Sequence, residues 1–166
     1  GDFNPAGRLP FSVPRSVGQI PLYYNKKAPQ SHDYVEMSAS PLYPFGYGLS
    51  YTSFDYSDLH LSALMPRSFE ISFKVRNTGK YDGEEVAQLY LRDEYASVVQ
   101  PLKQLKHFAR FYLKRGEERE VKFILSEEDF SLVDRNLKKI VEPGTFQIMI
   151  GAASNDIRLQ TKVEIK

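Results

Sequence analysis

Three groups of adjacent carboxylates are the first candidates for chemistry in this chain. They are Glu84-Glu85, Glu117-Glu118 and Glu127-Glu128-Asp129. Cleavage of a glycosidic bond, for example, needs two carboxylates about 5–9 Å apart across a sugar. Neighbouring residues of a strand point to opposite faces, so Glu84 and Glu85 cannot form such a pair by themselves. Because no supporting pattern accompanies any of the three groups, we expect none of them to be catalytic.

Metal, nucleophile and phosphate motifs are also missing from the sequence. The histidines, His32, His60 and His107, are 28 and 47 residues apart, which matches no metal motif, and the chain has no Cys. We expect each histidine to be structural or solvated. Gly46-x-Gly48 is followed by a predicted strand and not by a helix, so it does not indicate a phosphate site. The residues therefore predict no catalytic residue, no metal site and no cofactor.

Four aromatic residues, Tyr43, Phe45, Tyr47 and Tyr51, lie close together around two glycines. Aromatic side chains carry a large apolar area, which predicts that this segment packs against a domain surface. Exposed aromatic faces can also stack on sugars, which would make the chain a carbohydrate-binding or adhesion module. Both interpretations are kept, and the four residues are the candidate interface or sugar contacts.

The segment 103–115 mixes Lys and Arg with Phe and Tyr, as a nucleic-acid stacking surface would. Phe108 and Phe111 would point to opposite faces of a strand, however, and acidic residues follow directly. An edge strand protected by Lys and Arg is the favoured interpretation. The net charge of +1 gives no bulk attraction to nucleic acid or to membranes, and no run of about 18 apolar residues predicts a membrane span.

These residues must be positioned by strands, because apolar and polar residues alternate along most of the chain after residue 52. Phe69–Val75, Phe108–Leu113 and Val121–Leu125 alternate, whereas Val86–Leu91 is apolar enough to be buried on both faces. About seven short strands separated by turns predict an antiparallel β-sandwich. The chain has no Trp and no Cys, so we expect a core of other aromatics: Phe73, Tyr90, Phe111 and Phe123.

The first third of the chain is different. Seven of the 10 prolines precede residue 45, and 11 of the 22 aromatics lie in residues 1–56. Proline at this spacing prevents a helix of ordinary length. Short strands are possible at Leu9–Val13 and Gln19–Tyr24. No targeting segment is visible, and we expect an extended arm that belongs to a longer protein.

Five stretches, in this order, resemble glycoside hydrolase family 3. Gly1–Asn25, with Gly7-Arg8-Leu9-Pro10, is similar to the end of the family's α/β-sandwich domain. Tyr43-Pro44-Phe45-Gly46-Tyr47-Gly48-Leu49-Ser50-Tyr51-Thr52 resembles the linker that follows it in β-glucosidases. The last three resemble the C-terminal fibronectin type III-like domain of the family: Gly83–Tyr90, Leu102–Phe108 and Val141–Gly144.

The resemblance implies a fibronectin type III/immunoglobulin-like sandwich at residues 57–166, an aromatic linker at 31–56 and the tail of the α/β domain at 1–30. It also implies a retaining β-glucosidase-like or β-xylosidase-like parent, periplasmic or secreted and bacterial, that acts on β-linked glycosides. In that family the catalytic Asp and Glu belong to the barrel and the α/β domain, so no catalytic residue is carried over to this chain. The expected partners are those two domains, and the chain alone is expected to be inactive.

Overall fold

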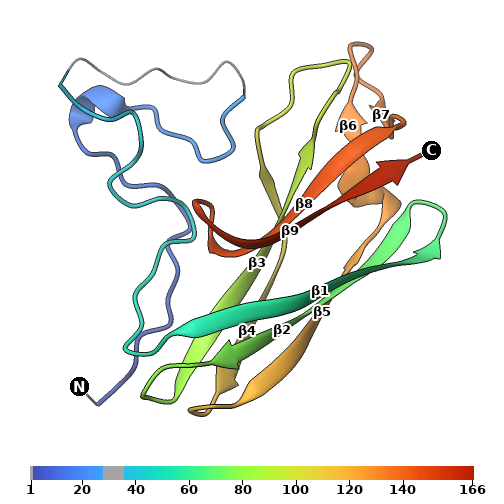
Figure 1. The fold of residues 1–166 in the computed structure, drawn as a ribbon. Helices are drawn as coiled ribbons and strands as arrows, with labels where there is room; N and C mark the ends of the chain where they lie inside the picture. The colour runs from blue at the N-terminus through green and yellow to red at the C-terminus, as the bar shows by residue number, and fades with distance from the viewer. Residues whose placement is uncertain (1, 28–35) are drawn as a thin grey trace.

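The computed structural model describes residues 2–27 and 36–166. His32 and the predicted domain boundary between residues 30 and 31 lie outside this range. Residues 54–166 form two packed antiparallel sheets, with strand orders β1-β2-β5 and β4-β3-β8-β9 (Figure 1). The predicted antiparallel β-sandwich is therefore confirmed. No described helix is long and apolar enough to cross a membrane.

Seven long strands build the two sheets, and a two-stranded ribbon, β6-β7, lies outside them. Their bounds are β1 Phe54–Met65, β2 Ser68–Asn77, β3 Gly83–Asp93, β4 Gln104–Leu113, β5 Glu118–Leu125, β6 Leu132–Val133, β7 Lys139–Ile140, β8 Gly144–Ala153 and β9 Asp156–Ile165. Two short 3₁₀ helices, η1 (Val17–Gln19) and η2 (Glu127–Phe130), are also present. The helix η2 begins with a capping box between Ser126 and Asp129.

The core lies between the sheets because alternate residues of each strand point inward. Phe73, Phe111 and Phe123 are buried there, as predicted. Tyr90 is fully buried as well, but it does not belong to this core cluster. Ala87, Leu89 and Leu91 are the residues of β3 that face the core, so Tyr90 points from the opposite face of the sheet. A second layer must therefore cover that face.

The arm, residues 2–27 and 36–53, supplies this layer by running along one side of the sandwich (Figure 1). Tyr24 contacts Tyr90 edge-on, and Phe45 stacks on Tyr24 with 3.9 Å between ring centroids. The backbone of Gly46 accepts a hydrogen bond from the buried side chain of Gln88 on β3. The arm is thus fixed to the outer face of the sheet by aromatic contacts and by a buried hydrogen bond.

The two short strands expected in the arm do not form. Leu9–Val13 pairs only locally with residues 43–47, through the backbone bonds Leu9 N to Tyr47 O and Val13 N to Tyr43 O. The segment Gln19–Tyr24 includes the end of the 3₁₀ helix η1. Pro10, Pro14 and Pro21 carry no N–H group, so these segments cannot make a continuous ladder.

Strand β4 is an edge strand, as its Lys and Arg content predicted. Phe108 is exposed on one face, while Phe111 is buried in the core on the other. The basic and aromatic side chains of segment 103–115 are therefore divided between two faces and do not form a single stacking surface.

Candidate functional site

A buried ion pair joins the arm to the end of the sandwich. Arg8 Nη2 of the arm lies 2.6 Å from Glu85 Oε1 of β3, and their side chains are 11% and 4% exposed. Glu85 follows the same alternation as Ala87 and Leu89, so its carboxylate points into the end of the core. The backbone N–H of Val86 also donates to Glu85 Oε1 at 2.6 Å. Arg8 therefore neutralises a carboxylate that would otherwise be buried without a counter-ion.

Tyr56 on β1 lies near this ion pair and stacks on the core residue Phe73. Burial raises the pKa of its hydroxyl far above the ordinary value, and the nearby Glu85 adds to the shift. Within the part of the chain that the structure describes, this buried hydroxyl has no hydrogen-bond partner. The guanidinium of Arg158 lies over the Tyr56 ring, 5.6 Å from its centroid.

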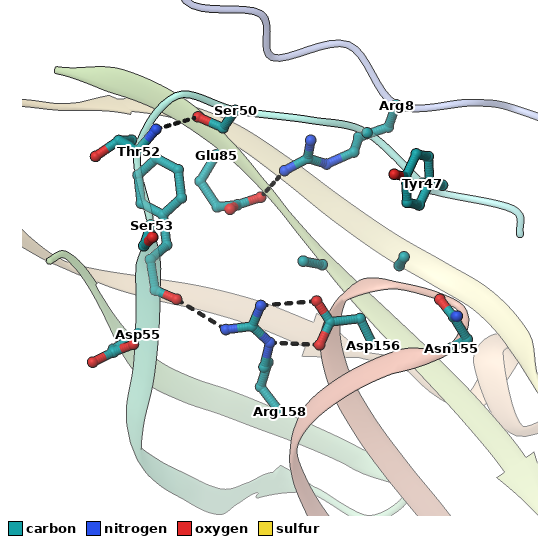
Figure 2. Close-up of a pocket in the computed structure, with 14 residues that line it drawn as sticks. Arg8, Tyr47, Ser50, Thr52, Ser53, Asp55, Glu85, Asn155, Asp156 and Arg158 are labelled. Atoms are coloured by element: carbon teal, nitrogen blue, oxygen red, sulfur yellow. Dashed lines mark hydrogen bonds and ion pairs between the residues drawn. The ribbon is translucent and has the colours of Figure 1, made fainter. Parts of the chain in front are cut away.

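Arg158 forms a second ion pair at the same end of the sandwich. Its guanidinium makes two hydrogen bonds to the carboxylate of Asp156, at 2.6 and 2.8 Å, and donates a third to the backbone oxygen of Phe54. Between the two ion pairs a cavity of about 530 Å³ opens (Figure 2). Figure 2 shows Arg8 and Glu85 on one side and Arg158 and Asp156 on the other, with Tyr47 and Asn155 at one end.

The four predicted contact residues take three different positions. Phe45 is half-buried in the stack with Tyr24, so its ring serves the contact with the sandwich. Tyr47 lines the cavity and lies against Tyr43, with ring centroids 4.9 Å apart. Tyr51 is 60% exposed and Tyr43 is 41% exposed. The sequence pattern located the segment, but it could not separate the ring that anchors the arm from those that face solvent.

The acidic groups and histidines form no catalytic arrangement among the described residues. Glu84 pairs with Arg110 of β4 at the surface, while its neighbour Glu85 is buried. Asp129 serves the capping box of η2 and lies 3.5 Å from His107 Nε2. In residues 2–27 and 36–166, no three His, Asp or Glu side chains are close enough to hold a metal ion. The ion pair between Arg8 and Glu85 was not predicted, because the two residues are 77 positions apart.

The fold and the contacts between the arm and the sandwich together define the class of protein. It is a fibronectin type III-like sandwich that carries a firmly attached arm. Two family models agree with this division. Residues 85–154 match the fibronectin type III-like domain, and residues 1–51 match the glycosyl hydrolase family 3 C-terminal domain.

Proteins and structures of the same family match over almost the whole chain. A β-xylosidase of Formosa agariphila is 44% identical over 97% of this chain, and a periplasmic β-glucosidase of Salmonella typhimurium is 44% identical over 95% of it. A solved β-glucosidase of Erythrobacter marinus superposes with a TM-score of 0.93 at 40% identity over 100% of the chain. The chain spans only 23%, 22% and 22% of these three proteins, respectively. It belongs to glycoside hydrolase family 3 as the C-terminal, fibronectin type III-like region.

Proposed function

We propose that this region is a structural module that holds the remaining domains of a family 3 β-glucosidase or β-xylosidase in place, and that it has no hydrolytic activity by itself. The parent would hydrolyse β-linked glycosides with carboxylates that lie outside this chain. A parent exported to the periplasm or secreted fits the name of the Salmonella relative. The predicted boundaries at residues 30 and 56 belong to this proposal; the nearest observations are the family match that ends at residue 51 and strand β1, which starts at Phe54.

The proposal depends on the large hydrophobic side chains that the arm exposes. Of the 19 large hydrophobic residues that are exposed among those described, nine lie in residues 2–51, with seven of them 57% exposed or more. They are Phe3, Phe11, Val17, Ile20, Tyr23, Leu42, Tyr43, Leu49 and Tyr51. Apolar residues at this density mark an interaction surface. The family match of the same segment identifies the partner that we propose, the rest of the glycosyl hydrolase family 3 C-terminal domain.

Activity measurements test the catalytic half of the proposal. The purified chain should release no p-nitrophenol from aryl β-glucoside or aryl β-xyloside. A chimera in which this chain replaces the matching region of the Erythrobacter marinus β-glucosidase should hydrolyse the aryl β-glucoside, and the same enzyme truncated before that region should not.

Surface variants of the chimera test the structural half. Phe11→Ser with Tyr23→Ser should lower the thermal stability and the activity of the chimera, because both side chains would meet the other domains. Tyr95→Ser is the matched control: Tyr95 is 84% exposed in the loop after β3, outside the arm. Turnover by the isolated chain, or a chimera indifferent to the double substitution, would overturn the proposal.

A further inference from the structure

We propose that the cavity between the arm and the sandwich binds a neutral pyranose unit, so that the module carries a carbohydrate site of its own. This inference goes beyond the structural role, which needs no ligand. The cavity is formed jointly by the two family segments, since Tyr47 and Ser50 come from the arm and Glu85 and Ala152 from the sandwich. Ligand sites are frequent at such junctions, and their volumes are about 300–1,000 Å³. The cavity volume of about 530 Å³ lies within that range.

The charges that line the cavity favour a neutral ligand. Both arginines are already paired with carboxylates, Arg8 with Glu85 and Arg158 with Asp156. Asp55 also lines the cavity, and it adds a third carboxylate. Two arginines against three carboxylates leave an excess of one negative charge, so an anion would be repelled. A polyhydroxylated neutral molecule fits this balance.

The unused polar groups of the cavity have the chemistry that sugar hydroxyls need. The side chains of Tyr47 and Asn155 lie at one end of it and make no hydrogen bond or ion pair within the described chain. The side-chain amide of Asn155 can both donate and accept, and so can the hydroxyl of Tyr47. Hydroxyl groups, which donate and accept, can satisfy this mixed set.

The half-buried ring of Tyr47 adds an apolar surface at one end of the cavity (Figure 2). The ring of Tyr43 lies against it, with the two planes tilted by 33°. An aromatic face can pack against the C–H groups of a pyranose while its hydroxyl group stays polar. Of the four aromatics that the sequence analysis singled out, Tyr47 is therefore the one that would touch the sugar.

Titration of the isotope-labelled chain with glucose, xylose, cellobiose and xylobiose, followed by NMR, tests the site. Saturable shifts should appear at the backbone amides of Ala152, Ala153 and Asn155. Binding of the monosaccharides would identify a free sugar as a sufficient ligand, whereas binding of the disaccharides alone would identify the end of a glycan chain. Glucuronate, the anionic counterpart of glucose, should bind more weakly than glucose.

Three single-residue variants locate the site. Tyr47→Phe and Asn155→Ala should each weaken binding of the neutral sugar by about fivefold, the loss expected for one hydrogen bond. Asp55→Asn removes a charge but keeps an oxygen acceptor, so it should leave the affinity for the neutral sugar unchanged. It should reduce only the discrimination against glucuronate. Tyr95→Phe and Asn136→Ala are the matched controls, since both residues are exposed and neither lines the cavity. Their affinity for the sugar should stay at the wild-type value.

Three results would overturn the proposal. They are the absence of saturable binding of every neutral sugar, binding that is unaffected by both Tyr47→Phe and Asn155→Ala, and tighter binding of glucuronate than of glucose by the wild-type chain. None of them bears on the structural role, which the chimera tests independently. The spectra of the variants show directly whether each one is folded.

Discussion

At the scale of single residues, the buried hydroxyl of Tyr56 is the clearest local conflict in the molecule. An unsatisfied buried polar group costs about 1–3 kcal/mol. The hydroxyl makes no hydrogen bond within the described chain, while the ring packs on Phe73. We expect Tyr56→Phe to leave the free energy of unfolding unchanged or to raise it by about 1 kcal/mol. Urea unfolding at neutral pH measures this, and a loss of stability would reveal a partner for the hydroxyl.

The same residue makes the protein sensitive to alkali. The pKa of Tyr56 is raised by burial above its ordinary value of 10.0, so the unfolded chain loses this proton at a lower pH than the folded chain. This titration therefore leaves the free energy of unfolding unchanged below pH 10.0 and lowers it as the pH rises above that value. At these alkaline pH values the free energy of unfolding should fall less steeply for Tyr56→Phe than for the wild type, by up to about 1.4 kcal/mol per pH unit. An equal slope for wild type and variant, measured by urea unfolding at several alkaline pH values, would contradict it.

The sequence predicts which single residues are buried only through the alternation of apolar and polar residues along a strand. The pattern correctly separates the faces of Phe108 and Phe111, and it places Phe73 in the core. Alternation does not tell which face of a strand buried on both sides meets the core, and Tyr90 lies under the arm instead. Asn77 shows a second limit. The pattern gives no signal that a polar residue at the end of a strand is buried, yet Asn77 is fully buried, with hydrogen bonds to Thr52, Gly79, Tyr81 and Leu113.

At the scale of elements, the attachment of the arm to β3 depends on the ion pair between Arg8 and Glu85. Breaking a buried pair by removing one partner costs about 3–5 kcal/mol, because the other charge stays buried and unpaired. We expect Arg8→Met to destabilise the chain by this amount, and Arg8→Met with Glu85→Gln to cost clearly less than the sum of the two single variants. Urea unfolding of the four proteins of this cycle measures the coupling.

The neighbouring residue provides the control. Glu84 pairs with Arg110, and those side chains are 30% and 54% exposed. Exposed pairs contribute about 0–1 kcal/mol, so Glu84→Gln should have little effect. An equal loss of stability in Glu84→Gln and Glu85→Gln would contradict the special role of the buried pair. The sequence predicts that the two glutamates face opposite ways, but it does not predict which of them an arginine of the arm reaches.

Elements with a strong alternating pattern were predictable, and those without one were not. About seven short strands were expected, and seven strands of 8 to 12 residues build the two sheets. The arm has no period, because its structure depends on side chains from elsewhere: Tyr24 and Phe45 pack on β3, and Asn4 donates to the backbone oxygen of Asp82. Long-range contacts of this kind leave no local signal, so the sequence predicted that the arm packs on a surface but not where it does so.

At the scale of the whole molecule, the sandwich should depend on the arm. A chain that starts at Thr52 would uncover the outer face of Tyr90 and leave Glu85 without Arg8. We expect it to be less stable than the full chain by more than about 3 kcal/mol and to bind a hydrophobic dye. Thermal and urea unfolding measure the loss.

A second substitution in the shortened chain distinguishes this dependence from a general effect of truncation. Glu85→Gln should destabilise the full chain, where the carboxylate has a partner, but stabilise the shortened one, where the charge is buried alone. The same sign in both backgrounds would contradict the proposed role of Arg8 in the sandwich.

The glycine at position 46 has a consequence for how such regions are exchanged between proteins. It has a φ of +80°, and a Cβ atom built there would lie 2.3 Å from the Gln88 side chain, so the arm fits this sandwich to within the size of one methyl group. A sandwich grafted behind the arm of another protein would need a matching residue at each of these two positions, the one in the arm and the one in the sandwich. The portable unit is therefore the arm together with its sandwich, and a graft joint placed between residues 51 and 54 would divide it.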